Sequence, residues 1–347
     1  SAHGSPSACS SGRAQGETGG EGMPDVRQTR TLLLCALGGT ISLDRDPCTG
    51  RNVAAYTAAD LLARTAYADA THIRCVDAPD MLKTIQRPAD LLALARFLNQ
   101  EMQKGEDGVV ITQGTDILEE VAYFLDEVFP PERPVVCTGA MRPAWAADYD
   151  GVRNLEQAVS LAQQVSLGYG VLVSLHEQVF EAWSVYKADT GALRGFAARC
   201  GAPWGGISGG QIDLPWRPSS RTRFGVLPTA LPGSVPILAM GVGDDAVLLD
   251  QLGARSAQGV VIASMGAGSI PPLACEKIMR LAARGVPVVL CSSAVGGRTA
   301  EEEYYPGAYD ELRAAGVVIE DHLNARKARI RLMLSVGLGR RYTPFGR

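Results

Sequence analysis

Short apolar runs alternate with amphipathic stretches from residue 31 onwards. Four runs rich in Val, Ile and Leu predict strands at Leu32–Leu37, Val109–Thr112, Val135–Thr138 and Val171–Leu175. Runs that are apolar at nearly every position are typical of parallel strands covered by helices on both faces. The pattern therefore predicts a parallel sheet inside an α/β domain.

Two stripes of apolar residues at helical spacing lie between these runs. One covers residues 117–128, and we expect Pro130 and Pro131 to terminate it because proline cannot continue a helix. The other covers residues 152–162, and Asp150 stands where an N-cap is expected. Both stripes predict helices that pack against the sheet.

A second alternating series begins near residue 235. It predicts helices around 272–283 and 322–336 and strands at Ile237–Met240, Val260–Ala263, Val288–Cys291 and Val317–Ile319. Residues 214–234 are rich in proline and lack periodicity, so we interpret them as a linker. The expected fold class is α/β, with a larger N-terminal parallel-sheet domain at 31–213 and a smaller C-terminal Rossmann-like, flavodoxin-like domain at 235–347.

The composition is that of a globular protein. Of 347 residues, 46% are hydrophobic and 20% are charged, whereas disordered chains contain fewer apolar residues. Residues 1–30 are the exception. Because residues 1–22 are rich in Gly and Ser, we interpret the segment 1–30 as a disordered tail or as residues added for expression. No run of about 18 apolar residues predicts a membrane span. The net charge of −4, without a basic block, argues against a nucleic-acid partner.

The eight cysteines form no C-x-x-C pair, and several lie in or beside apolar runs, among them Cys35, Cys137 and Cys291. This arrangement is typical of buried free thiols rather than of disulfides or a zinc site. The four histidines show no H-x-x-x-H spacing, so we expect no metal. Free thiols favour a reducing compartment, and we expect a cytoplasmic protein.

The first candidate site is the turn Leu37-Gly38-Gly39-Thr40-Ile41 after the first predicted strand. Ligands of open α/β sheets gather at the carboxyl ends of the strands, and paired glycines allow the backbone to approach a ligand closely. Taken alone, a turn without function explains the same glycines better. A third glycine is absent, which excludes the dinucleotide-binding pattern G-x-G-x-x-G.

The second candidate is Ile111-Thr112-Gln113-Gly114-Thr115-Asp116, which leads from a predicted strand into the start of a helix. Helix N-termini present unpaired N–H groups and partial positive charge, which suit a carboxylate or a developing oxyanion. Thr115 or Asp116 could also be an ordinary N-cap. A Gly-Thr pair after two strands of one sheet is more specific, and two hydroxyls beside a carboxylate suggest nucleophilic chemistry.

Residues 206–210, Gly-Ile-Ser-Gly-Gly, match the G-x-S-x-G pattern of hydrolase nucleophiles. That pattern requires a strand before it and a helix after it, whereas Pro203 precedes the match and Pro215 follows it. We therefore interpret these residues as a glycine-rich loop. His176 and His322 have no evident partner, and we interpret them as surface or packing residues.

Together, the two Gly-Thr segments resemble the signature motifs of the bacterial-type L-asparaginase family, which also contains glutaminase-asparaginases. The agreement extends in order from about residue 31 to about residue 336, through 119–126, 139–143, Asp150-Gly151, Asn154-Leu155, Leu323-Asn324 and Lys327-Ala328-Arg329. The resemblance implies that the N-terminal domain is catalytic and that the chain hydrolyses the side-chain amide of L-asparagine to L-aspartate and ammonia. It implies no cofactor.

By position in these motifs, the resemblance implies that Thr40 is the nucleophile and forms an acyl-enzyme. Thr115, Asp116 and Lys187 would form the second group of the site, with Lys187 assigned from its place before 188–190. In the family the aspartate binds the α-ammonium of the substrate. A threonine hydroxyl needs a base or a strong local field. A lysine can be that base only when burial or its neighbours lower its pKa from ~10.4.

The resemblance also implies several substrate contacts. Backbone N–H groups near Gly39 and Gly114 would bind substrate and stabilise the oxyanion. The family places a lid tyrosine shortly after the nucleophile, and Tyr56 is the nearest candidate, displaced by a few residues. Ala78 and Pro79 stand where the family has a substrate-binding Ser-Gln pair, so only their backbone could make that contact.

Ala267 stands where many relatives carry an asparagine that reaches the site from a neighbouring subunit. A missing buried donor costs about 1–3 kcal/mol, so these departures predict weak affinity for free L-asparagine or a changed substrate. Two alternatives stay open: an amidohydrolase acting on glutamine or a modified asparagine, and a non-catalytic amino-acid-binding sensor. By analogy with the family we expect a homodimer or a homotetramer.

Overall fold

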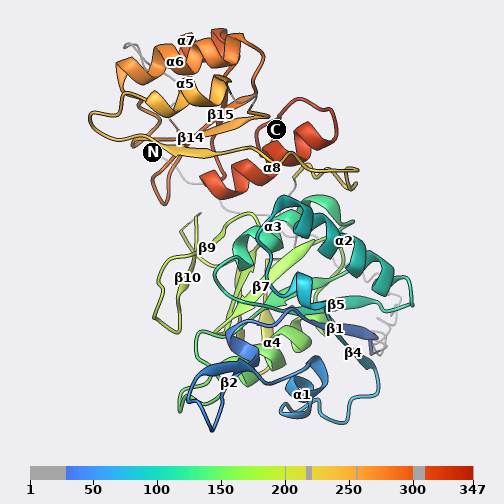
Figure 1. Cartoon of the computed structure of the whole chain (residues 1–347). Coiled ribbons are helices and arrows are strands. Elements are labelled where there is room, and N and C mark those ends of the chain that lie inside the picture. Colours follow the sequence, from blue (N-terminus) through green and yellow to red (C-terminus); the bar gives the residue numbers. More distant parts are fainter. Residues whose placement is uncertain (1–28, 200, 216–220, 255–256, 300–308, 347) are drawn as a thin grey trace, which may run out of the picture.

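The structure is a computed structural model that describes residues 29–199, 201–215, 221–254, 257–299 and 309–346 (Figure 1). Almost all of the expected N-terminal tail lies outside these ranges. The described chain forms two α/β domains, as the apolar pattern predicts. The larger domain contains the N-terminal half of the chain, and the smaller contains most of the C-terminal third.

Within the described ranges, eight strands form the sheet of the larger domain, in the order β12-β11-β8-β7-β6-β5-β1-β4. Its parallel part comprises β4 (Ile73–Asp77), β1 (Leu32–Ala36), β5 (Gly108–Thr112), β6 (Val135–Thr138) and β7 (Val171–Leu175). The predicted strands and their parallel pairing are confirmed. An antiparallel edge, which the apolar runs do not predict, adds β8 (Gln178–Glu181), β11 (Gly205–Ser208) and β12 (Gln211–Asp213).

Helices cover both faces of this sheet. On one face α2 (Pro88–Met102) and α3 (Leu118–Val128) pack against alternate strand residues such as Leu33 and Cys35. On the other face α1 (Ala58–Ala63) and α4 (Gly151–Gln164) pack against Leu32 and Leu34. Because side chains alternate across a strand, each apolar strand contributes to both layers of core.

Two of these helices, α3 and α4, are the ones that the apolar stripes predict. Asp150 does occupy the N-cap position of α4, but its carboxylate makes no cap hydrogen bond. It accepts hydrogen bonds from the backbone N–H groups of Met141 and Arg142 instead. Asp150 therefore holds the loop after β6 rather than the first turn of its own helix.

Short elements project from the strand ends of the larger domain. One hairpin pairs β2 (Leu43–Arg45) with β3 (Asn52–Ala54), and another pairs β9 (Val185–Lys187) with β10 (Phe196–Ala198). Two single-turn 3-10 helices, η1 (Thr40–Ser42) and η2 (Asp80–Leu82), follow β1 and β4. Of the predicted site residues, Thr40 lies in η1 and Lys187 in β9.

The smaller domain has a parallel sheet in the order β13-β14-β15-β16, at the places that the second apolar series predicts. The strands are β13 (Ile237–Ala239), β14 (Val260–Ser264), β15 (Val288–Ser292) and β16 (Val318–Glu320). The helices are α5 (Val247–Ala254), α6 (Pro272–Ala283), α7 (Tyr309–Ala314) and α8 (Ala325–Gly337).

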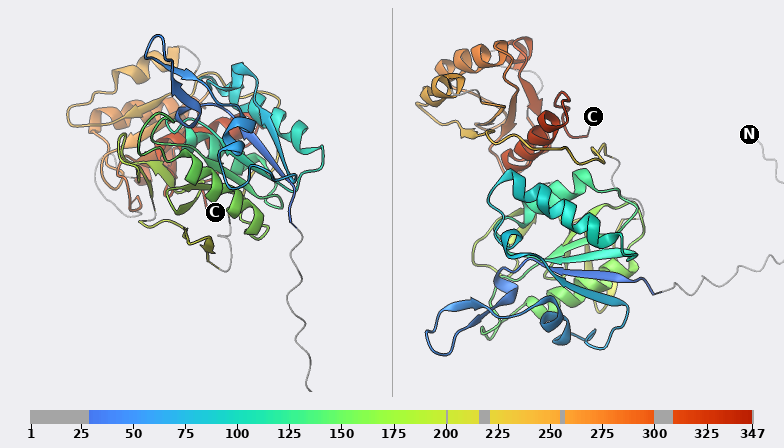
Figure 2. Two further views of the ribbon diagram at one scale, coloured as in Figure 1. Left: turned by 90° about the horizontal axis from the view of Figure 1, so that it is seen from below. Right: turned by 45° about the vertical axis from the view of Figure 1, so that its right-hand side comes forward.

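Helix α8 joins the two domains. It packs on α3 of the larger domain and on β14 and β15 of the smaller one. It is the red helix between the two domains in Figure 1 and in Figure 2. Its apolar residues Ile330, Leu332 and Leu334 belong to a core that also contains residues of α3. One of the hydrophobic cores is therefore shared by the two domains, and the smaller domain has a further core of its own.

The segment expected to be a linker is packed rather than free where the structure describes it. Arg221 is buried and pairs with Asp126 at 2.8 Å and with Glu181 at 2.6 Å. Phe224 and Leu227 pack against the same core as α3. A proline-rich composition reports the absence of helix or strand, and it says nothing about whether side chains are buried.

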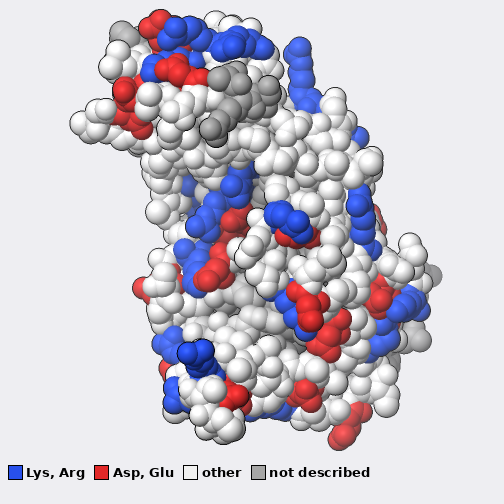
Figure 3. Space-filling model, in the orientation of Figure 1, with Lys and Arg blue, Asp and Glu red and all other residues white. Residues whose placement is uncertain are grey.

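Positive and negative side chains are mixed on the surface, as expected for a chain with a net charge of −4 and no basic block. On the face shown in Figure 3, Lys and Arg are interspersed with Asp and Glu, and no continuous basic stripe crosses it. Among the helices that the structure describes, none is both long enough and apolar enough to cross a membrane.

Candidate functional site

The two Gly-Thr turns lie against each other at the carboxyl ends of β1 and β5. A Cβ atom added to Gly39 would lie 2.2 Å from the backbone nitrogen of Gly114, so no side chain fits there. Gly39 also has φ +85°, a conformation that favours glycine. Gly139 approaches in the same way, because its Cβ would lie 2.6 Å from the Gln113 carbonyl oxygen. The glycines are thus required by this contact between neighbouring strands.

Thr40 starts η1 directly after this contact. The backbone of the turn is closed by hydrogen bonds from Ser42 N to Gly39 O and from Leu43 N to Thr40 O. Among the described residues, no group accepts the backbone N–H of Thr40 or of Thr115, and none hydrogen-bonds the Thr40 hydroxyl. Both N–H groups and the hydroxyl are therefore available to a ligand.

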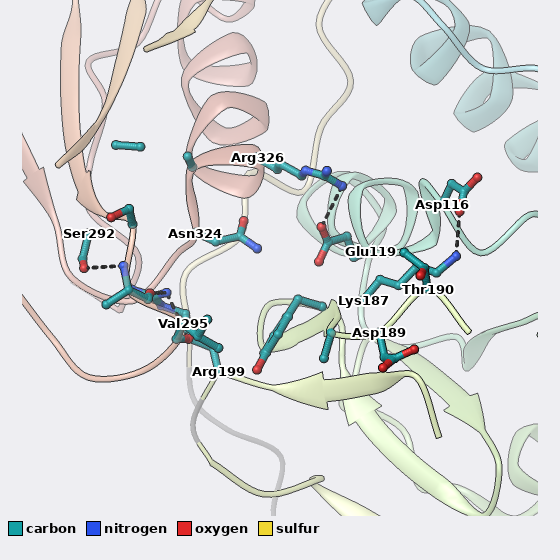
Figure 4. Close-up of a pocket in the computed structure, with 16 residues that line it drawn as sticks. Asp116, Glu119, Lys187, Asp189, Thr190, Arg199, Ser292, Val295, Asn324 and Arg326 are labelled. Carbon is teal, nitrogen blue, oxygen red and sulfur yellow. Dashed lines mark hydrogen bonds and ion pairs between the residues drawn. The ribbon is translucent and has the colours of Figure 1, made fainter. Parts of the chain in front are cut away.

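Lys187 connects the second group of predicted site residues. Its Nζ donates to Thr115 Oγ1 at 2.9 Å and to Asp116 Oδ1 at 2.6 Å. Figure 4 shows Lys187 and Asp116 pointing toward one another. Thr115 is buried, whereas the side chain of Asp116 is 91% exposed. The carboxylate therefore faces solvent while its lysine partner is largely covered.

Two buried residues not predicted from the sequence, Lys327 and Glu119, lie near Lys187, and Lys327 supports the strand that carries it. Buried Lys327 of α8 donates to the carbonyl oxygens of Val185 and Trp183, and burial lowers the pKa of Lys327 to about 7. Buried Glu119 of α3 pairs with Arg326 of α8 at 3.3 Å (Figure 4). Burial also raises the pKa of Glu119. Lys327 lies in the segment Lys327-Ala328-Arg329, which resembles a motif of the family, but only the fold reveals its contacts.

Tyr56 lies beside the nucleophile turn, although its hydroxyl is already engaged. It hydrogen-bonds the carboxylate of Asp44, which raises the pKa of Tyr56. The Arg64 guanidinium lies 4.3 Å from the centre of its ring. Tyr149, a residue absent from the sequence predictions, donates to Ile41 O at 2.7 Å. A lid role for Tyr56 stays a prediction that requires release from Asp44.

The positions that depart from the family pattern lie at the edge of the site. The N–H of Ala78 is donated to Ala36 O, and Pro79 has no N–H, so neither offers a backbone donor to a substrate carboxylate. Ala267 is exposed on the loop after β14, and its carbonyl accepts a hydrogen bond from Tyr309. The contacts expected of Ala78 and Pro79 would have to use their carbonyl oxygens, which repel a carboxylate.

Two cavities flank Asp116. One of about 580 Å³ lies between the domains and is lined by Lys187, Glu119, Arg199 and Asn324, among others (Figure 4). The other, of about 220 Å³, lies on the side of Gly39 and Gly114. The second cavity borders the nucleophile turn, and its size suits a small molecule such as an amino acid.

The remaining candidates have structural explanations. The expectation of a glycine-rich loop at 206–210 is wrong, because residues 206–208 belong to β11 and a tight turn leads from Ser208 back into β12. No helix follows Ser208, as a hydrolase nucleophile of this pattern would require. His322 lies against the rings of Trp183 and Phe345. Among the described residues, no group of three or more His, Cys, Asp or Glu is arranged to hold a metal ion.

Comparison with known proteins places this geometry in a family. Residues 31–220 match the family "Asparaginase, N-terminal", and residues 234–344 match "Glutaminase/Asparaginase C-terminal domain". A probable L-asparaginase of Deinococcus radiodurans is 36% identical over 73% of this chain and 77% of the relative. L-asparaginase 2 of Escherichia coli is 32% identical over 71% of this chain and 70% of the relative.

A solved structure gives the same result. The crystal structure of a probable cytoplasmic L-asparaginase from Campylobacter jejuni superposes with a TM-score of 0.74 and 28% sequence identity. The superposition covers 88% of this chain and 94% of that one, so it includes both domains.

Proposed function

This chain belongs to the asparaginase family, and on that basis we propose that it hydrolyses the side-chain amide of L-asparagine to L-aspartate and ammonia, with Thr40 as the nucleophile. The observation that carries the proposal is the arrangement of Lys187, Thr115 and Asp116 beside the turn that presents Thr40. The contact between Gly39 and Gly114 supports it, because it joins the two groups into one site.

In this proposal the Thr40 hydroxyl oxygen attacks the amide carbon of the substrate. The free N–H groups of Thr40 and Thr115 suit the oxygen of the tetrahedral intermediate, since donors in place before the reaction stabilise developing charge. The amine leaves as ammonia, and water then releases aspartate from the ester on Thr40.

Lys187 and Thr115 supply the proton chemistry. Lys187 donates into the Thr115 oxygen, so the hydroxyl hydrogen of Thr115 is directed to another acceptor. In the first step that acceptor is the leaving nitrogen, and the Thr115 oxygen takes up the proton that the Thr40 hydroxyl loses, so the nitrogen departs as neutral ammonia. In the second step the attacking water gives a proton to the Thr115 oxygen, and the Thr115 hydroxyl returns one to Thr40. The Asp116 carboxylate, exposed on the same side, suits the α-ammonium of the substrate.

Ammonia release from L-asparagine and L-glutamine, measured in parallel, tests the proposal. We expect the wild type to release ammonia from L-asparagine, Thr40→Ala to release none, and Thr40→Ser to retain measurable turnover because it keeps the hydroxyl. Equal activity of Thr40→Ala and the wild type would exclude Thr40 as the nucleophile. Release from L-glutamine alone would support the alternative amidohydrolase, and L-asparagine binding without turnover would support the sensor.

We also propose that the chain forms homodimers or homotetramers. The smaller domain exposes several large aliphatic side chains, including Val242, Val247, Leu248 and Leu273. The larger domain also exposes apolar side chains, such as Met81 and Leu167, and exposed apolar residues mark association surfaces where they are contiguous. Light scattering after size-exclusion chromatography tests this, and we expect Leu273→Glu to shift the mass toward the monomer.

A cytoplasmic location is the third proposal. Cys35, Cys137 and Cys291 are buried free thiols, and such thiols persist in a reducing compartment. The similar Campylobacter jejuni protein is described as cytoplasmic, whereas a relative from Haemophilus influenzae is described as periplasmic. Cell fractionation followed by immunoblotting distinguishes the two locations.

A further inference from the structure

A site for a free amino acid requires groups of both signs. At neutral pH the substrate carries an α-ammonium and an α-carboxylate, and each loses its hydration on binding. If the chain acts on an amino acid, as proposed above, Asp116 provides the anion. Ala78 and Pro79 offer the carboxylate no backbone N–H, so a cation that borders the same cavity is a candidate partner for it.

Lys83 is such a cation. It lines the 220 Å³ cavity together with Gly39, Gly114 and Asp116, and it is the only Lys or Arg among the described lining residues. A Cβ added to Gly38 would lie 3.8 Å from Lys83 Cβ, 3.9 Å from Cγ and 4.0 Å from Cδ. The aliphatic part of Lys83 therefore runs along the nucleophile turn.

The present partner of Lys83 can be exchanged for a ligand. Its Nζ pairs with Asp80 at 2.8 Å, but the Asp80 side chain is 96% exposed. Surface ion pairs of this kind contribute little because water screens them. Asp80 also raises the pKa of Lys83, so the ammonium stays charged at neutral pH. We expect a substrate carboxylate in the cavity, where less water would screen the pair, to be a stronger partner than Asp80.

Gln113 gives a second, independent indication of a ligand in the same cavity. Its side chain is only 2% exposed, yet neither Oε1 nor Nε2 has a hydrogen-bond partner among the described residues. Buried amides are normally paired. Because Gln113 is one of the residues that line the cavity, a rotation of its buried amide toward the cavity would let Nε2 donate to a ligand there.

We propose that Lys83 is the residue that binds the α-carboxylate of the substrate, with the Gln113 amide beside it and Asp116 holding the α-ammonium. Lys83 would then determine specificity, since it selects substrates that carry a free carboxylate next to the amine. It takes no part in the bond-breaking steps. Its place at the end of η2, after the Ala78-Pro79 pair, gives this chain a cation where those side chains offer no contact.

The test compares L-asparagine with 3-aminopropanamide, which is asparagine without its α-carboxylate. For Lys83→Met we expect KM for L-asparagine to rise at least tenfold with kcat changed less than threefold. Turnover of 3-aminopropanamide should not change, and Lys83→Arg should restore most of the affinity for L-asparagine. Lys104→Met is the matched control, because Lys104 is an exposed lysine that pairs at the same i,i+3 spacing, with Glu101, outside the cavity. It should behave as the wild type.

The outcomes separate this inference from the proposed function. An unchanged KM for L-asparagine in Lys83→Met, or equal changes for both compounds, would overturn the role of Lys83 and leave the asparaginase reaction intact. If the wild type released no ammonia, the proposed function would fail. Calorimetric titration with L-asparagine and with 3-aminopropanamide would then test the role of Lys83. If Lys83 binds the α-carboxylate, Lys83→Met should bind L-asparagine more weakly than the wild type does, with no change in the binding of 3-aminopropanamide.

Discussion

The ammonium nitrogen of Lys327 lies 3.0 Å from the carbonyl oxygen of Trp183. A second bond, to Val185 O, places the same ammonium at the start of β9, two residues before Lys187. Helix α8 of the smaller domain therefore supports the strand that carries a predicted catalytic lysine of the larger one. The two domains are coupled at the site itself.

Replacement of Lys327 by Met should disturb this support. We expect kcat for L-asparagine to fall on the order of tenfold to a hundredfold, since small displacements of reacting groups have effects of this size. KM should change little, because Lys327 is buried away from the small cavity. Steady-state kinetics provide the measurement. Lys277→Met, which removes a surface ion pair of the smaller domain, is the control, and an equal loss there would contradict the interpretation.

Lys327 should also make stability depend on pH. Burial lowers its pKa to about 7, whereas an unfolded lysine titrates near ~10.4. Between these values the unfolded chain binds more protons than the folded protein, so the contribution of Lys327 to stability improves as pH rises. We expect the free energy of unfolding of the wild type, relative to Lys327→Met, to increase by about 1 kcal/mol per pH unit above pH 7. Urea unfolding at pH 7, 8 and 9 measures it; parallel profiles would show that Lys327 keeps its proton.

Gly39→Ala should prevent the two Gly-Thr turns from meeting. The added Cβ would lie 2.2 Å from Gly114 N, in a backbone conformation that alanine rarely adopts. Strained backbone alone costs about 1–3 kcal/mol, and the collision adds to it. We expect lower thermal stability and no ammonia release. Gly50→Ala is the matched control, since Gly50 also has positive φ but an added Cβ would meet nothing within 4 Å. Loss of activity in both variants would show that strain rather than contact matters.

The buried ion pair between Arg331 of α8 and Glu127 of α3 should stabilise the contact between domains. Arg331 Nη1 lies 2.8 Å from both carboxylate oxygens of Glu127. Removing one partner leaves a buried charge without compensation, which costs about 3–5 kcal/mol. We expect Arg331→Met to lower the free energy of unfolding by this amount in urea titrations. Arg280→Met, at an exposed pair with Glu276, should change it by less than about 1 kcal/mol.

Continuous apolar runs made most of the fold predictable. Strands such as β5 and β14 are buried along their whole length, so every position reports burial. The antiparallel edge was not predictable in this way, because β12 is short and largely exposed. The apolar stripe of α2 could have been found, since Leu91, Leu94, Ala95 and Leu98 follow helical spacing and are buried.

The candidate site was predictable as chemistry but not as geometry. Thr40 and Thr115 follow strand ends that parallel pairing necessarily brings to one edge. Lys187 was assigned from its position alone, and the structure places its ammonium on Thr115 and Asp116. The backbone contacts expected from Ala78 and Pro79 found no support, because hydrogen bonding of the backbone depends on neighbouring strands.

The sequence by itself determined which chemical groups stand at the ends of the strands and which family the chain belongs to, because strand burial and motif order are local properties. Only the tertiary structure decided that Lys327 supports β9, that Lys83 shares a cavity with Asp116, and that Gly39 touches Gly114. Residue periodicity reports that a side chain is buried. The partner that it meets depends on how distant segments pack, and the chain order does not encode that in any local pattern.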